Sequence, residues 1–193
     1  MILFQGNSDR LRDMFADITL CAAKDSDHLP NLAAVQFEAI SGVLEIAATD
    51  RYTLAVWTVE TAAEDFKGLV NAKELTTALK LAPKNRDVAV RYESDGLRLV
   101  WREGDVKVSF IDYHFPKYRE TVPVATGEAS VDRLYIAPKV MSLLAKTKTV
   151  AQWEITFTGN NRPVMAQGVD DSGADSSLRV WVMPAPERKG ARR

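Results

Sequence analysis

The sequence predicts an α+β protein with antiparallel sheets, built from three copies of one unit. Apolar residues recur at helical spacing in three short stretches, and the runs between them alternate with the two-residue period of strands. The order strand, helix, three strands occurs three times along the 193 residues. This prediction depends on the order of the elements and needs no similarity between the amino acids of the three copies.

The first unit is expected in residues 1–60. Residues 1–6 predict a strand, and Asn7 or Ser8 can cap a helix directly after it. One face of this helix is apolar at the i, i+3, i+4, i+7 spacing: Leu11, Met14, Phe15, Ile18 and Ala22. Alternating, β-branched runs then fill residues 31–60, with a Ser-Gly turn after the first run. We therefore expect three antiparallel strands in this stretch.

The second unit repeats this order. FKGLVN predicts a short strand, and Asn71 followed by Glu74 resembles a capping box. The helix that this box begins would turn an apolar stripe inward and end at a proline: Leu75, Ala78, Leu79 and then Pro83. The runs DVAVRYE, GLRLVWRE and VKVSFIDY predict three strands, because the tripeptides SDG and EGD between them suit tight hairpins.

The third unit is expected in residues 128–186. SVDRLYI predicts a strand, and Pro138 suits the first turn of a helix with the apolar residues Val140, Met141, Leu143 and Leu144. QWEITFT, RPVMAQGV and SLRVWVMP predict three more strands. The chain then divides into a complete two-unit domain at 1–123, a linker at 124–127, a one-unit half domain at 128–186 and a flexible basic tail at 187–193.

The composition excludes several classes of protein. No apolar run approaches the roughly 20 residues of a membrane span, and the N-terminus lacks the features of a secretion signal, so we expect a cytoplasmic protein. Cys21 is expected to be buried, and one cysteine with two histidines leaves few ligands for a metal, so we expect no metal and no cofactor. The net charge of −1 requires that basic residues gather on one surface if DNA is a partner.

Three motifs resemble those of the bacterial DNA polymerase III β sliding clamps. LEIAATDRYTLAVWTVE is similar to the clamp signature A-T-D-G-x-R-L-A between two strands. FIDYHFPKYRETVP resembles the F-P-D-Y-x-x-x-x-P that closes the middle domain of the clamp, and VWVMPAP resembles its terminal V-V-M-P-M. The resemblance implies the DNA-clamp fold, in which antiparallel sheets lie outside and helices line a central hole.

The sequence also departs from this family. A clamp subunit has three domains of two units, and two subunits close a ring of twelve units, whereas three units are counted here. Arg51 stands where the motif has glycine, Thr53 where it has arginine, and Glu120 replaces a basic residue. We expect these changes to alter which peptides are bound more than they alter the fold.

The function that the resemblance implies involves no catalysis. A sliding clamp, or polymerase processivity factor, encircles duplex DNA of any sequence and tethers replication proteins to it. Its partners would be double-stranded DNA, DNA polymerase and other proteins with clamp-binding peptides, a clamp loader and further copies of itself. Four chains of three units would supply a homo-oligomeric ring of twelve, with the third units joining two by two; a smaller ring or a dimer that opens is also compatible with three units.

Helices that line such a hole should turn lysines and arginines toward the phosphates, because those contacts attract DNA without reading its bases. The candidates for this DNA-facing set are Arg10, Arg12, Lys73, Lys80, Lys84, Lys139, Lys146 and Lys148. Asp9, Asp13 and Asp17 dilute the charge of the first helix, so the lysines rank above the arginines. For any single residue, an ordinary solvated helix surface explains the charge equally well. The DNA-facing prediction therefore depends on the basic residues lying together on the same side of the helices.

The resemblance also implies a hydrophobic groove that holds short peptides of partner proteins. Carried over by motif, its wall would comprise Leu32, Thr49, Arg51, Tyr52, Thr53, Leu54, Pro116, Glu120, Thr121, Trp181, Val182, Met183 and Pro184. Apolar and aromatic residues from separate segments suit the anchoring of peptides. Plain core packing is the alternative for Leu32, Leu54 and Val182, and Trp181 can be either a buried residue or an exposed anchor.

Three other functions stay open at this point. A clamp-like binding protein could modulate a replication machinery without encircling DNA. An assembly protein could use the fold for oligomerisation alone. An enzyme on this scaffold is disfavoured because the sequence has few histidines and cysteines, no carboxylate cluster and no nucleotide or hydrolase motif. The carboxylate Asp50 is expected to cap a turn.

Overall fold

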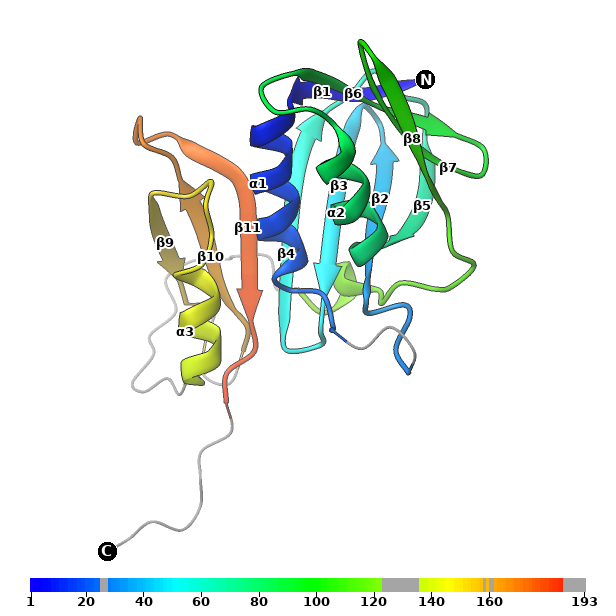
Figure 1. The fold of residues 1–193 in the computed structure, drawn as a ribbon. Coiled ribbons are helices and arrows are strands. Elements are labelled where there is room, and N and C mark those ends of the chain that lie inside the picture. Colours follow the sequence, from blue (N-terminus) through cyan, green and yellow to red (C-terminus); the bar gives the residue numbers. More distant parts are fainter. Residues whose placement is uncertain (25–27, 123–135, 158, 160–161, 186–193) are drawn as a thin grey trace, which may run out of the picture.

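The fold is taken from a computed structural model, which describes all residues except 25–27, 123–135, 158, 160–161 and 186–193. The strands of this described part form two antiparallel sheets, one of four strands and one of seven. Residues of all three helices share one apolar core with one side of the seven-stranded sheet, and Figure 1 shows α1 and α2 side by side across that sheet. The predicted α+β class with antiparallel sheets is confirmed.

The first unit has the predicted order of elements. It comprises β1 (Ile2–Asn7), α1 (Ser8–Thr19), β2 (Ala34–Ile40), β3 (Val43–Thr49) and β4 (Thr53–Glu60). Asn7 caps α1 by accepting a hydrogen bond from the backbone N–H of Asp9 at 2.9 Å. The helix ends at Thr19, before the expected Ala22, and the chain continues in short turns toward β2.

The second unit follows with β5 (Phe66–Asn71), α2 (Ala72–Leu81), β6 (Asp87–Glu93), β7 (Gly96–Trp101) and β8 (Gly104–Ser109). Asn71 caps α2 through the backbone N–H groups of Lys73 and Glu74, and the predicted apolar stripe of this helix is buried. The expectation that the last strand runs to residue 113 was wrong. Phe110 instead bridges to Val70 and takes the chain out of the four-stranded sheet.

The first two units exchange their first strands. β1 pairs with β6 of the second unit, and β5 pairs with β2 of the first unit, both antiparallel. The two helices are antiparallel as well, because the start of α1 meets the end of α2: the Ser8 hydroxyl donates to the Pro83 carbonyl at 2.8 Å. Each unit therefore completes the sheet of the other.

After β8, residues 110–122 cross to the side of the seven-stranded sheet that faces away from the helices. Gly68 makes this crossing possible, because a β-carbon there would lie 2.2 Å from the ring of Phe110. The segment ends in a short 3-10 helix, Tyr118–Glu120. It covers a second, smaller apolar cluster that includes Leu54 and Phe115.

The third unit contains α3 (Pro138–Leu144), β9 (Gln152–Thr156), β10 (Val164–Val169) and β11 (Asp175–Val182). Pro138 opens α3 as predicted. The linker expected at 124–127, the tail at 187–193 and all but the last residue of the strand expected at 130–136 lie outside the described residues, and Ile136 is not in a strand. The division of the chain into domains therefore stays a prediction.

The third unit joins the first by strand pairing. β11 pairs antiparallel with β4, with Leu178 opposite Trp57 and Val182 opposite Thr53, which makes one continuous seven-stranded sheet. On the helical side, the buried carboxylate of Asp17 in α1 accepts hydrogen bonds from the loop after α3. We call this contact the Asp17 latch.

Candidate peptide groove and DNA-facing surface

The turn between β3 and β4 is held by its own side chains. Asp50 accepts hydrogen bonds from the backbone N–H of Tyr52 at 3.0 Å and from both the N–H and the hydroxyl of Thr53 at 2.7 and 2.8 Å. The Thr49 hydroxyl donates to the Thr53 carbonyl at 2.7 Å. Asp50 therefore caps a turn, as predicted, and the turn places Thr49, Thr53 and Tyr52 beside the end of β11.

Arg51 occupies a strained position in this turn. Its φ is +75°, in the left-handed region that a side chain with a β-carbon disfavours. This is the position at which the resembling motif has glycine, and the sequence alone predicts only a change of binding preference there. The backbone conformation shows that the change also affects stability, because an arginine here costs about 1 kcal/mol of conformational strain.

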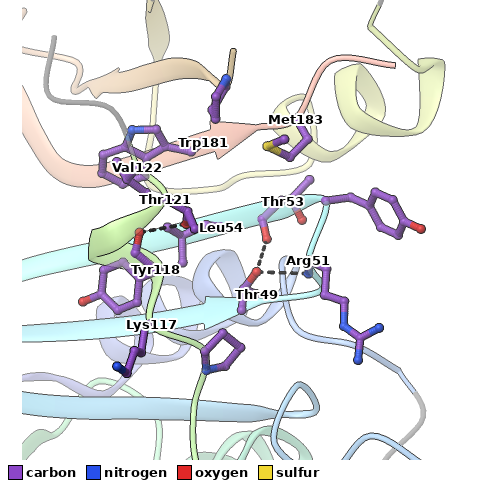
Figure 2. A pocket seen from close by; sticks show the side chains of 13 residues that line it. Thr49, Arg51, Thr53, Leu54, Lys117, Tyr118, Thr121, Val122, Trp181 and Met183 are labelled. Carbon is purple, nitrogen blue, oxygen red and sulfur yellow. Dashed lines mark hydrogen bonds between the residues drawn. The ribbon is translucent and has the colours of Figure 1, made fainter. Parts of the chain in front are cut away.

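The end of β11 forms the opposite wall. Met183 donates its backbone N–H to the Tyr52 carbonyl at 2.9 Å, and Trp181 lies across from Leu54 in the strand register. Because side chains alternate along a strand, Trp181 and Met183 share the side away from the helices. Figure 2 shows both side chains along one edge of the pocket, with Thr49 and Tyr118 toward the other.

The third wall is the segment before residue 123. Tyr118 is anchored there by its hydroxyl, which donates to Glu45 at 2.5 Å, and its ring meets Phe115 edge-on. Burial and the bond to the Glu45 carboxylate raise the pKa of Tyr118 well above its ordinary value. Arg119 fixes the segment further by ion pairs with Glu38 and Glu45.

These three walls enclose a pocket of about 240 Å³. Its lining is Thr49, Arg51, Tyr52, Thr53, Leu54, Pro116, Lys117, Tyr118, Thr121, Val122, Pro163, Trp181 and Met183. The lining is mainly apolar, and among the described residues its charged side chains are the cations of Arg51 and Lys117. Such a site accommodates one or two apolar side chains of an extended peptide and favours acidic neighbours.

The structure brings most of the predicted groove residues together but leaves four out. Leu32 and Val182 are 1% and 2% exposed and belong to packed interior. Glu120 is exposed and pairs with Lys117 at 3.3 Å, and Pro184 lies outside the lining. Conversely, the lining includes residues that were not predicted from the sequence: Lys117, Tyr118, Val122 and Pro163. Whether this groove binds peptides stays a prediction.

The basic residues predicted to face DNA differ in whether hydrogen bonds or ion pairs already hold their side chains. Arg12 is 20% exposed on its side chain and donates to the Leu79 carbonyl at 3.1 Å and to the Ala82 carbonyl, so it caps the end of α2. Lys148 pairs with Asp13 at 2.8 Å, which raises the pKa of the lysine. Lys139 lies 4.0 Å from Asp50.

The remaining candidates on the helical side are exposed: Arg10, Lys73, Lys80, Lys84 and Lys146. Among the described residues, no ion pair involves Lys73, Lys80, Lys84 or Lys146. Lys73 and Lys80 project from α2, away from its buried stripe. The charge available for phosphates is therefore concentrated on α2 and around α3, and little of it belongs to α1.

No family model matches the chain. A curated protein, the "Beta sliding clamp" of Micrococcus luteus, is 28% identical over 172 residues, which cover 84% of this chain and 54% of that protein. The chain is similar in sequence to the bacterial sliding clamp. It spans about half the length of this relative, so the activity of a whole clamp is not carried over by the match alone.

Solved clamps have the same fold. The DNA polymerase III β subunit of Thermotoga maritima superimposes with a TM-score of 0.74 at 18% identity, covering 96% of this chain and 66% of that one. The sliding clamp of Bacillus subtilis gives a TM-score of 0.73 at 15% identity, covering 96% and 64%. The expected resemblance to the clamp family and the DNA-clamp fold are both confirmed.

The described residues of this chain contain no group of side chains that could hold a metal ion. Cys21 is buried, and burial raises the pKa of its thiol to about 12, so it is a poor nucleophile. No described helix is long and apolar enough to cross a membrane.

Proposed function

We propose that this protein is a DNA sliding clamp that encircles duplex DNA as a homo-oligomeric ring and tethers replication proteins through the groove. The observation that carries this proposal is the separation of two surfaces by one sheet. The unpaired lysines lie on the helical side of the seven-stranded sheet, and the apolar groove lies on the opposite side, over the pairing of β4 with β11. A ring with its helices inward would present lysines to DNA and the groove to partners outside.

The partners follow from this arrangement. Lysines without fixed acceptors attract the phosphates of any duplex, so binding is independent of sequence and weakens with salt. The groove would take an apolar peptide segment from a DNA polymerase or another replication protein. A closed ring needs a loader to open it on circular DNA, and with three units in a chain four chains would complete a ring of twelve.

Topological retention tests the proposal without the loader. A linear duplex is fixed to a bead at one end, the protein threads over the free end, and that end is then blocked with a bulky protein. We expect the clamp to stay on the blocked duplex in 1 M salt and to leave after a restriction enzyme cuts the DNA. A protein that only adheres to phosphates would be removed by 1 M salt from blocked and unblocked DNA alike. Loss of the protein from blocked DNA in 1 M salt would therefore overturn encirclement.

A second function is favoured by one observation: a single chain supplies all three walls of the pocket. A monomer could therefore occupy clamp-binding peptides and modulate a replication machinery without encircling DNA. The solution mass distinguishes the two functions. A closed oligomer at micromolar concentration supports the ring, whereas a stable monomer that still binds such peptides supports the modulator.

A further inference from the structure

The third unit presents an open face on the helical side of the sheet. Its strand β9 is the last of the seven strands, and β10 is the only neighbour it has among the described residues. In the same unit, Met141 of α3 is 49% exposed, and Ile155 and Phe157, in and directly after β9, are 39% and 40% exposed. We call Met141, Ile155 and Phe157 with the free edge of β9 the open face.

The open face continues the main core. Trp153 and Ile155 alternate along β9, so they share one side of the strand, and Phe157 follows at the same period. Trp153 packs against the core and donates its indole N–H to the Leu144 carbonyl at the end of α3. Apolar side chains therefore extend from a packed interior to a strand edge that pairs with no second strand in the described part of the chain, and such a surface is one that proteins normally cover.

The same chain shows how such a face is covered. In the first unit, the corresponding edge strand β2 is paired by β5 of the second unit, and α2 packs antiparallel beside α1. The residues that β2 turns toward the helices, Val35, Phe37 and Ala39, are completely buried as a result. What closes the face of one unit is a second unit that offers a strand and an antiparallel helix.

We propose that the open faces of the third units of two copies close each other, so that two chains build one composite clamp domain across a two-fold axis. A second copy is the fitting partner because it carries the same half-built face, and one isologous contact covers both. As α1 and α2 do in the first two units, the two α3 helices would lie antiparallel in this contact. This proposal rests on the proposed ring and names one of the contacts that would close it.

Two single substitutions on the open face test the contact in the full chain. Met141→Asp and Ile155→Asp each place a carboxylate where the partner's apolar side chains would bury it. By light scattering after size exclusion, we expect each variant to have half the mass of the parent oligomer at the same concentration. Tyr113→Asp is the matched control, because Tyr113 is also exposed, at 55%, but lies on the opposite side of the sheet; it should keep the parental mass.

Hydrogen exchange gives a second reading that needs no substitution. In the parent, amides in residues 152–156 should exchange at least tenfold more slowly at concentrations where the oligomer forms than in dilute monomer. An exchange rate that does not depend on concentration, or parental masses in both variants, would overturn the composite domain.

The threading experiment keeps this inference separate from the proposed function. If the parent protein is retained on blocked DNA while Met141→Asp and Ile155→Asp keep its mass, the composite domain is refuted and the clamp stands. If the parent is monomeric and is not retained, the clamp itself fails and the composite domain fails with it.

Discussion

The Asp17 latch should stabilise the third unit against the first, and Asp17→Asn tests it. Asp17 is 2% exposed. One of its carboxylate oxygens lies 2.8 Å from the backbone N of Lys148, and the other lies 2.9 Å from the backbone N and 2.6 Å from the hydroxyl of Thr149. Asparagine has nearly the same shape, so the change removes the charge and one acceptor without opening a cavity.

The expected magnitude follows from these contacts. An asparagine keeps one oxygen for the donors of one residue and turns an NH₂ group toward the donors of the other. A hydrogen bond to a charged group contributes about 1.5–3 kcal/mol, and a buried donor without an acceptor costs a further 1–3 kcal/mol. Because such terms are not additive, we expect Asp17→Asn to lower the free energy of unfolding by about 3 kcal/mol.

The assay is urea unfolding at a fixed protein concentration, since oligomers make the midpoint depend on concentration. Asp13→Asn is the matched control, because Asp13 contacts the same Lys148 but through an exposed ion pair. An exposed pair contributes about 0–1 kcal/mol, so the control should change the free energy of unfolding by less than 1 kcal/mol. Equal, small losses in both variants would refute the reasoning that the buried carboxylate holds the two units together.

Three further predictions concern the groove, the helical side and the strained turn. Trp181→Ala should weaken a clamp-binding polymerase peptide about 30-fold, as loss of a central aromatic anchor does; unchanged affinity by fluorescence anisotropy would remove Trp181 from the site. Lys73→Ala with Lys80→Ala should lower the salt slope of DNA binding by about two, and a parental slope would take both off the DNA wall. Arg51→Gly should raise the free energy of unfolding by up to about 1 kcal/mol by relieving its positive φ, whereas Tyr52→Gly should lower it; equal destabilisation would contradict the strain.

The elements were predictable because their signals are local. Asn71 and Pro138 begin helices where capping chemistry and a fixed proline φ place them, and Asp50 caps its turn as short polar side chains do. The end of β8 was not predictable in this way. Phe110 leaves the strand because it packs over Gly68, a residue some forty positions earlier. The sequence around Phe110 contains no pattern that predicts this contact.

The pocket overlaps the groove that the resemblance predicted, and the differences between the two sets of residues have physical causes. Val182 could have been excluded from the sequence, because the alternation of a strand puts it on the side opposite Trp181 and Met183. Tyr118 could have been included among the groove residues, since it is an aromatic residue inside the quoted motif and aromatic side chains often line peptide-binding sites. Pro163 carries no such signal, because only the pairing of distant strands brings it to the site.

Asp17 shows a different limit of sequence reasoning. In the sequence it is one of three aspartates that dilute a basic helix, whereas in the structure it is the buried acceptor of a loop more than 130 positions away. Charge patterns identify which residues can be solvated. They do not identify which of them a distant segment will cover.

The exchange of first strands between units 1 and 2 has a consequence for how the protein folds during translation. β1 finds its partner only when residues 87–91 have been made, which at roughly 5–20 residues per second takes on the order of 10 s. Until then, neither unit has a finished sheet, so neither can fold to completion alone. The two units should therefore reach the native state in one late, cooperative step with a high contact order, and a nascent chain arrested after β4 should be an easy target for proteases and chaperones.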